Sequence, residues 1–165
     1  HKIEVKLKRK GLHARSRDGY RDKTAQSRTA DLTMSSLTFG FEQNPLDVAL
    51  EFGRPERRDD GNYLVPLVVK IPLGKISLLP KEGGERAQLH VYVAVMDDKG
   101  ATTPVQDNPV GVDIPTAKVQ QAQQQYYSYE MKLLMAPGNQ TVAVAVRDDV
   151  GAAVSIVRRA VAVGG

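Results

Sequence analysis

The stretches "VAVMDDKGA" at residues 93–101 and "VAVRDDVGA" at residues 144–152 are identical at seven of nine positions. Each begins as an apolar strand pattern, continues with an Asp-Asp-x-Gly turn and leads into another apolar run. Aspartate bonds to nearby backbone groups in turns, and glycine accepts a positive φ. Because little similarity extends beyond the turns, we expect two similar hairpins and not a duplicated domain. In an immunoglobulin-like layout, the strands that enter these turns lie side by side in one sheet.

The same pattern of short strands separated by glycine and proline extends over most of the chain. The expected strands cover residues 46–52, 62–71, 87–96, 102–114, 126–135, 140–148 and 152–163. Pro115, followed by good helix formers at 117–124, predicts one or two helical turns. The sequence therefore predicts an all-β fold, an antiparallel immunoglobulin-like β-sandwich of about seven strands over 46–165.

The residues before the sandwich differ from it in pattern and in charge. Alternation over 1–22 predicts a β-hairpin, and 23–45 read as a connector that is partly helical. Residues 1–28 hold ten basic and three acidic side chains, or +7, whereas the whole chain carries +4. The candidates for binding a polyanion are Lys6, Lys8, Arg9, Lys10, Arg15 and Arg17. A basic strand face also protects a sheet edge from association, and we favour this interpretation over nucleic-acid binding.

No arrangement of residues typical of catalysis is present. The chain has no cysteine, its three histidines are widely separated, and the common nucleophile, phosphate-loop and zinc motifs do not occur. We therefore expect a protein that is not an enzyme and that needs no cofactor, and we interpret His90 as an ordinary histidine of a strand. The low-ranked calcium candidates are the turn carboxylates Asp97, Asp98, Asp148 and Asp149, which we interpret mainly as solvated turns.

The first twenty residues resemble the end of a known module. Lys2-Ile3-Glu4-Val5, Lys8-Arg9, Gly11, Ala14-Arg15, Arg17 and Gly19-Tyr20 resemble the closing stretch of the von Willebrand factor type A domain in bacterial VWFA-related proteins. The segments "NPLDVAL", "YLVPLVVKIPLGKISLLP", "VYVAVMDDKG", "PVQDNPVGVDIP" and "YEMKLLMAPGNQTVAVAVRDDVGAAVS" resemble the domain that follows it. The resemblance implies a preceding type A domain in the parent chain and an exported protein, secreted or in the cell envelope. The D-x-S-x-S stretch of the type A adhesion site does not occur in this chain.

These observations lead to one preferred function and two alternatives. We expect a noncatalytic structural or protein-interaction module that binds an unidentified protein partner. The first alternative is a carbohydrate- or ligand-binding sandwich, for which Tyr126, Tyr127 and Tyr129 form the densest aromatic cluster. The weaker alternative is binding of a polyanion or nucleic acid through the basic hairpin. The absence of a long apolar run also predicts that no segment spans a membrane.

Overall fold

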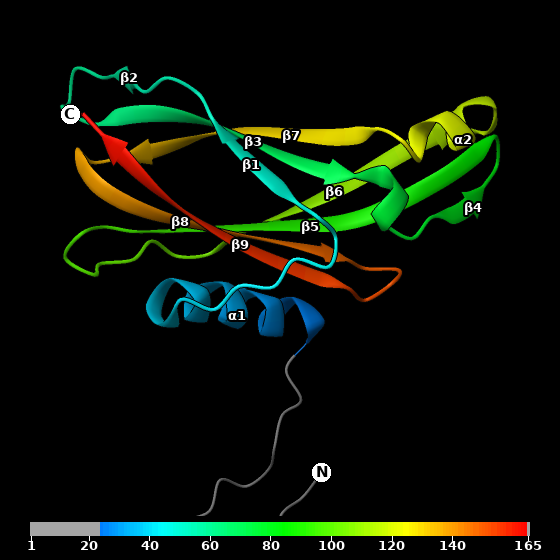
Figure 1. Cartoon of the computed structure of the whole chain (residues 1–165), viewed down its shortest axis with the longest axis horizontal. Helices are drawn as coiled ribbons and strands as arrows, with labels where there is room; N and C mark the ends of the chain where they lie inside the picture. The colour runs from blue at the N-terminus through cyan, green and yellow to red at the C-terminus, as the bar shows by residue number, and fades with distance from the viewer. Residues whose placement is uncertain (1–23, 165) are drawn as a thin grey trace, which may run out of the picture.

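Two antiparallel sheets pack face to face, and one long helix covers the outer face of the larger sheet (Figure 1). The computed structural model describes residues 24–164. The hairpin expected over 1–22, including its six candidate polyanion-binding residues, lies outside these residues. The described part confirms the prediction of an all-β antiparallel sandwich. Within it, no helix is both long enough and apolar enough to cross a membrane.

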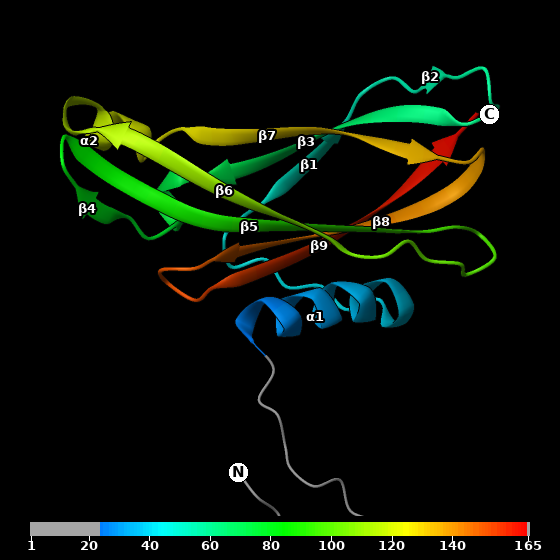
Figure 2. The same cartoon turned by 180° about the vertical axis from the view of Figure 1, so that it is seen from behind.

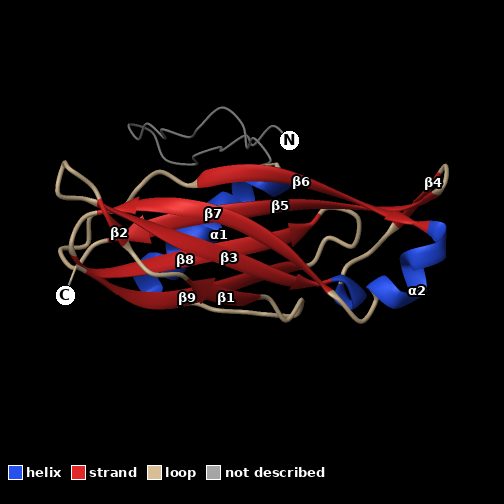
Figure 3. Ribbon diagram, turned by 90° about the horizontal axis from the view of Figure 1, so that it is seen from above, coloured by secondary structure: helices blue, strands red, loops and turns tan. Residues whose placement is uncertain are grey.

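The larger sheet has the order β4-β5-β8-β9, with β6 on the other side of β5. The smaller sheet is built around β3, with β1 and β2 on one side and β7 on the other. The strands of the larger sheet are β4 (Leu79–Lys81), β5 (Gly84–Met96), β6 (Gln106–Pro115), β8 (Gly138–Asp148) and β9 (Val154–Val163). Those of the smaller sheet are β1 (Ala49–Phe52), β2 (Glu56–Arg57), β3 (Tyr63–Pro72) and β7 (Tyr126–Met135). Figure 3, seen from the side of the smaller sheet, shows β3 and β7 crossing over the larger sheet.

Alternate residues of the longer strands point between the sheets and form the core. Val65, Leu67 and Val69 of β3 are almost completely buried there, as are Val142 and Val144 of β8. Alternation arises because successive side chains of a strand point to opposite faces. β8 departs from it, since the apolar run 142–146 is buried on both faces: its valines face the core and its alanines face the helix.

The helix α1 (Ala25–Phe39) lies across β5, β8 and β9 on the side away from the smaller sheet (Figures 1 and 2). Thr24 caps its first turn by accepting from the Ser27 amide at 3.1 Å, and Gly40 ends it at φ 74°. Its buried residues are small or hydroxyl-bearing: Thr29, Thr33, Ser36 and Leu37. The sheet presents three alanines to this face, Ala94, Ala143 and Ala145, together with Tyr92 and Ile156. The helix falls within the segment expected to be a partly helical connector.

Seven of the nine strands of the described chain lie within a few residues of the positions that the sequence predicts. Two short strands, β2 and β4, were not expected, and the strand expected from residue 102 begins only at Gln106. The helical turns expected after Pro115 are present as η2 (Thr116–Lys118) and α2 (Val119–Ala122). Another short helix, η1 (Leu73–Lys75), follows β3.

The two repeated hairpins have the arrangement that the sequence predicts, because β5 and β8 pair directly, with Val93 opposite Val144. Their turns differ in one respect. Gly100 has a φ of 84°, as expected, but in the second turn the positive φ of 59° belongs to Ala152. A Cβ on Gly151 would lie 2.5 Å from the Ser77 hydroxyl, so that glycine is needed for space.

Candidate functional site

The structure separates the two pairs of turn aspartates that were candidate calcium ligands. Because β5 and β8 are antiparallel, Asp148 lies opposite Leu89, whereas the turn with Asp97 and Asp98 follows Met96, which lies opposite Thr141. The two turns are therefore at opposite ends of the strand pair. Among residues 24–164, no group of three or more histidine, aspartate or glutamate side chains is arranged to hold a metal ion.

Two of these four carboxylates, Asp148 and Asp97, bind backbone amides in or near their own turns. Asp148 is buried and accepts from the amides of Ser77 at 2.7 Å, and of Val150 and Gly151 at 3.0 Å. Asp97 accepts from two amides of its own turn in the same way, at 2.9 and 2.8 Å. These bonds close the Asp-Asp-x-Gly turns, which is the role that aspartate has in many turns.

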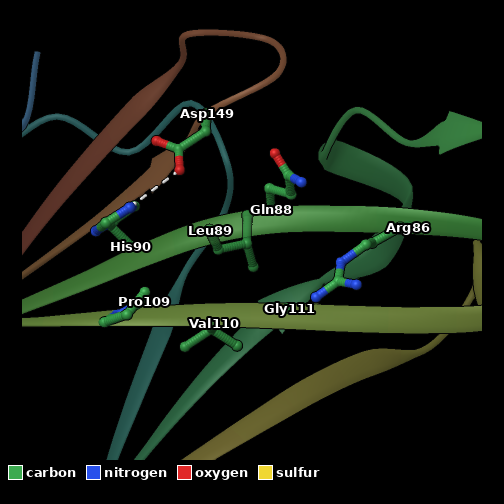
Figure 4. Close-up of a pocket in the computed structure, with 8 residues that line it drawn as sticks. All are labelled: Arg86, Gln88, Leu89, His90, Pro109, Val110, Gly111 and Asp149. Carbon is green, nitrogen blue, oxygen red and sulfur yellow. Dashed lines mark ion pairs between the residues drawn. The ribbon is translucent and has the colours of Figure 1, made fainter.

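A polar cluster around His90 lies on the outer face of the larger sheet, beside α1. The Nδ1 of His90 is 2.6 Å from Oδ1 of Asp107 on β6. The Nε2 of His90 is 3.2 Å from Oδ2 of Asp149, and Figure 4 shows this second contact. The Nε of Arg147 is 3.2 Å from the other oxygen of Asp149. Sequence reasoning treated His90 as an isolated residue because its partners lie 17 and 59 positions away in the chain, and no local motif connects them.

This cluster borders a shallow pocket of about 410 Å³. Arg86, Gln88 and His90 come from one face of β5, and Pro109 and Gly111 lie opposite them on β6. The Arg86 guanidinium lies directly over Gly111, where a Cβ would be 2.4 Å from it. Both ring nitrogens of His90 face carboxylates, those of Asp107 and Asp149. The pocket therefore offers polar and charged contacts.

Tyr92 is the next residue of the same strand face, with its ring 6.0 Å from that of His90. It is completely buried under α1, and its hydroxyl has no hydrogen-bond partner. The Thr29 hydroxyl lies close enough to lower the pKa slightly, but the pair lacks hydrogen-bond geometry. Burial, followed by the negative charges of Asp107 and Asp149, raises the pKa of Tyr92 to about 12.

A different kind of surface is present at the edge of the smaller sheet. β7 pairs with β3 along its whole length, and its other edge makes no backbone hydrogen bond to any described residue. The strand has ten residues, no proline and only two charges, Glu130 and Lys132. An unpaired strand of this kind is able to accept another strand.

The other long edges in the described part of the chain are less open. The outer edge of β9 is occupied by the segment before β1, since Gln43 exchanges two backbone bonds with Ile156 and Leu46 donates to the Ser155 hydroxyl. β6 contains Pro109 and carries Asp107 and Asp113. Proline removes a donor, and charges oppose association at an edge. β7 is therefore the best edge for strand addition.

The side chains of β7 divide between its two faces. Tyr127, Tyr129 and Met131 point toward the core but remain half exposed at the open side of the sandwich. On the outer face, Leu134 is 56% and Tyr126 61% exposed, and Leu134 lies opposite Leu64 of β3. A second pocket, of about 310 Å³, lies here over Pro66, Val68, Glu130 and Lys132. The three tyrosines do not form one exposed platform of the kind that a sugar-binding face uses.

Comparisons with known proteins give a limited result. No protein-family model matches the sequence, and no curated protein matches it. Similar solved structures include a Northeast Structural Genomics Consortium target, with TM-score 0.49 and 16% identity over 74% of this chain and 90% of that chain. A Bacteroides uniformis beta-glucuronidase has TM-score 0.46 and 7% identity over 70% of this chain and only 13% of its own. A Bordetella pertussis protein described as ApaA has TM-score 0.43 and 8% identity over 73% of this chain and 96% of that chain. None of these similarities carries an argument about function.

Proposed function

We propose that this chain is a noncatalytic protein-interaction module of an exported bacterial VWFA-related protein, in which it follows a type A domain. The observation that supports the interaction role is the free edge of β7, with half-exposed apolar side chains along one face and Leu134 and Tyr126 on the other. Tyr127, Tyr129 and Met131 follow one another along one face of the strand, and exposed apolar surface is typical of sites where proteins bind each other. The support for the parent protein and for its export is the sequence resemblance of residues 1–20.

The polar pocket gives less support to an activity. Its histidine is held by two carboxylates, and its other side chains come from short strand segments without a nucleophile. We therefore place the interaction at β7 and assign His90 the task of tying β5 to β6 and to the turn after β8.

Site-specific photo-crosslinking in the intact parent protein tests this proposal. A benzophenone amino acid at position 134 replaces an exposed leucine of β7, and one at position 88 replaces an exposed glutamine of the pocket. We expect covalent adducts with a polypeptide from position 134 and none from position 88. The proposal is wrong if position 134 gives no polypeptide adduct in the native host while position 88 does, or if neither position gives one.

A further inference from the structure

We propose that the partner of β7 is the β7 strand of a second copy of this chain, paired antiparallel about a twofold axis at Met131. This inference rests on the proposed interaction role of β7 and adds the partner and the register. It is argued from the free edge, from the distribution of charge and apolar residues along the strand, and from the symmetry that two identical strands must obey.

Symmetry limits the registers that two copies of β7 can adopt. A twofold axis perpendicular to the sheet places outer-face residues opposite outer-face residues. Each possible register is therefore defined by the one residue of β7 that lies at the axis and faces its own copy. With the axis at Glu130 or at Lys132, two identical charges face each other. With the axis at Met131, Glu130 of each copy lies opposite Lys132 of the other. Opposite charges directly across an antiparallel pair stabilise it, and like charges destabilise it. The charge pattern therefore selects the Met131 register.

The inner face of the strand fits the same register. Tyr127 lies opposite Met135, Tyr129 opposite Leu133, and Met131 opposite its own copy. The three half-exposed members of this set, Tyr127, Tyr129 and Met131, gain apolar neighbours at the open side of each sandwich. The pairing also gives hydrogen-bond partners to the backbone edge that β3 leaves free. The two smaller sheets then form one continuous sheet across the dimer.

Within the described chain, the only ion pair that involves Glu130 or Lys132 is a weak one. The Nζ of Lys132 is 3.6 Å from Oε2 of Glu56, and both side chains are more than half exposed. An exposed pair of this kind contributes little and leaves Lys132 available to a second partner. Glu56→Gln is thus a matched control, because it removes the intrachain pair and leaves β7 unchanged.

Sedimentation velocity of the full chain over a range of concentrations tests the proposal. We expect a monomer–dimer equilibrium in the micromolar range (about 1–300 µM), as suits one strand pair. Lys132→Glu and Glu130→Lys each place two like-charge pairs in the interface, and each should raise the dissociation constant at least about tenfold. Glu56→Gln should not change it.

Two restoring experiments separate this interface from a loss of folding. The double variant Glu130→Lys/Lys132→Glu again pairs opposite charges in the Met131 register and should dimerise like the original chain. An equimolar mixture of the two single variants should form a heterodimer, although each variant alone is impaired. A chain that stays monomeric throughout, or a dimer that these substitutions do not affect, would overturn the proposal. If the chain is monomeric but position 134 still crosslinks to another polypeptide, this inference fails while the interaction role stands.

Discussion

Replacement of Tyr92 by phenylalanine should make the protein more resistant to alkali. The Tyr92 hydroxyl is buried under α1 without a hydrogen-bond partner, and burial beside Asp107 and Asp149 raises the pKa to about 12 from the ordinary value of 10. A group whose pKa is higher in the folded state contributes stability that is complete below its unfolded pKa. That contribution is lost as the pH rises from about 10 through about 12.

The size of the effect follows from the shift. One pKa unit corresponds to about 1.4 kcal/mol, so a shift of about two units gives at most about 2.7 kcal/mol. At about pH 11 the unfolded tyrosine is mostly ionised and the folded one mostly neutral, which costs the original protein about 1.4 kcal/mol. At neutral pH, removal of an unpartnered buried hydroxyl should be neutral or stabilising, by up to about 1 kcal/mol.

Urea unfolding of both proteins at several pH values between neutral and about 11 measures this difference. The free energy of unfolding of Tyr92→Phe should exceed that of the original by a margin that widens above pH 10. A margin for Tyr92→Phe that is constant with pH, or a variant that is less stable at all pH values, would refute the reasoning.

Three further predictions concern the turns and the helix. Asp148→Ala leaves three amides without their acceptor and should lower the free energy of unfolding by about 3 kcal/mol. Asp97→Ala, in the more exposed turn, should lower it by only about 1 kcal/mol. Equal losses for the two variants in urea unfolding would contradict this prediction. Leu37→Ala removes the largest buried side chain of α1 and should lower the free energy of unfolding by about 3 kcal/mol in the same assay. A decrease below about 1 kcal/mol would show that the helix is not firmly packed against the sheet. Millimolar calcium should leave the thermal midpoint unchanged relative to chelator, because a site saturated 100-fold would add about 2.7 kcal/mol and shift it by several degrees.

The strands could be predicted from the sequence because their signals are local. β7 was located at its observed bounds, and the pairing of β5 with β8 followed from the repeated turns. Period-two alternation and the glycines and prolines between strands depend only on neighbouring residues. The very short β2 and β4 have too few residues for alternation to be visible. The helix over 25–39 was foreseen only in part, because its buried face consists of threonine, serine and one leucine and so lacks an apolar stripe.

The polar cluster could not be predicted because it depends on pairing between distant strands. His90 meets Asp107 only because β5 and β6 pair with His90 opposite Pro109, and it meets Asp149 only because β8 lies on its other side. The free edge of β7 was hidden for a similar reason. A strand's own residues do not show whether it has one neighbour or two, and that depends on the order of the sheet.

The position of α1 places the N-terminal end of the described chain on the outer side of the larger sheet. Thr24 lies on the outer side of the larger sheet, whereas β3 and β7 lie in the opposite layer (Figure 1). A group attached directly at Thr24 therefore lies on the side of the sandwich away from β7, and the smaller sheet faces the other way. A bulky label placed at that residue should consequently leave the β7 edge unobstructed.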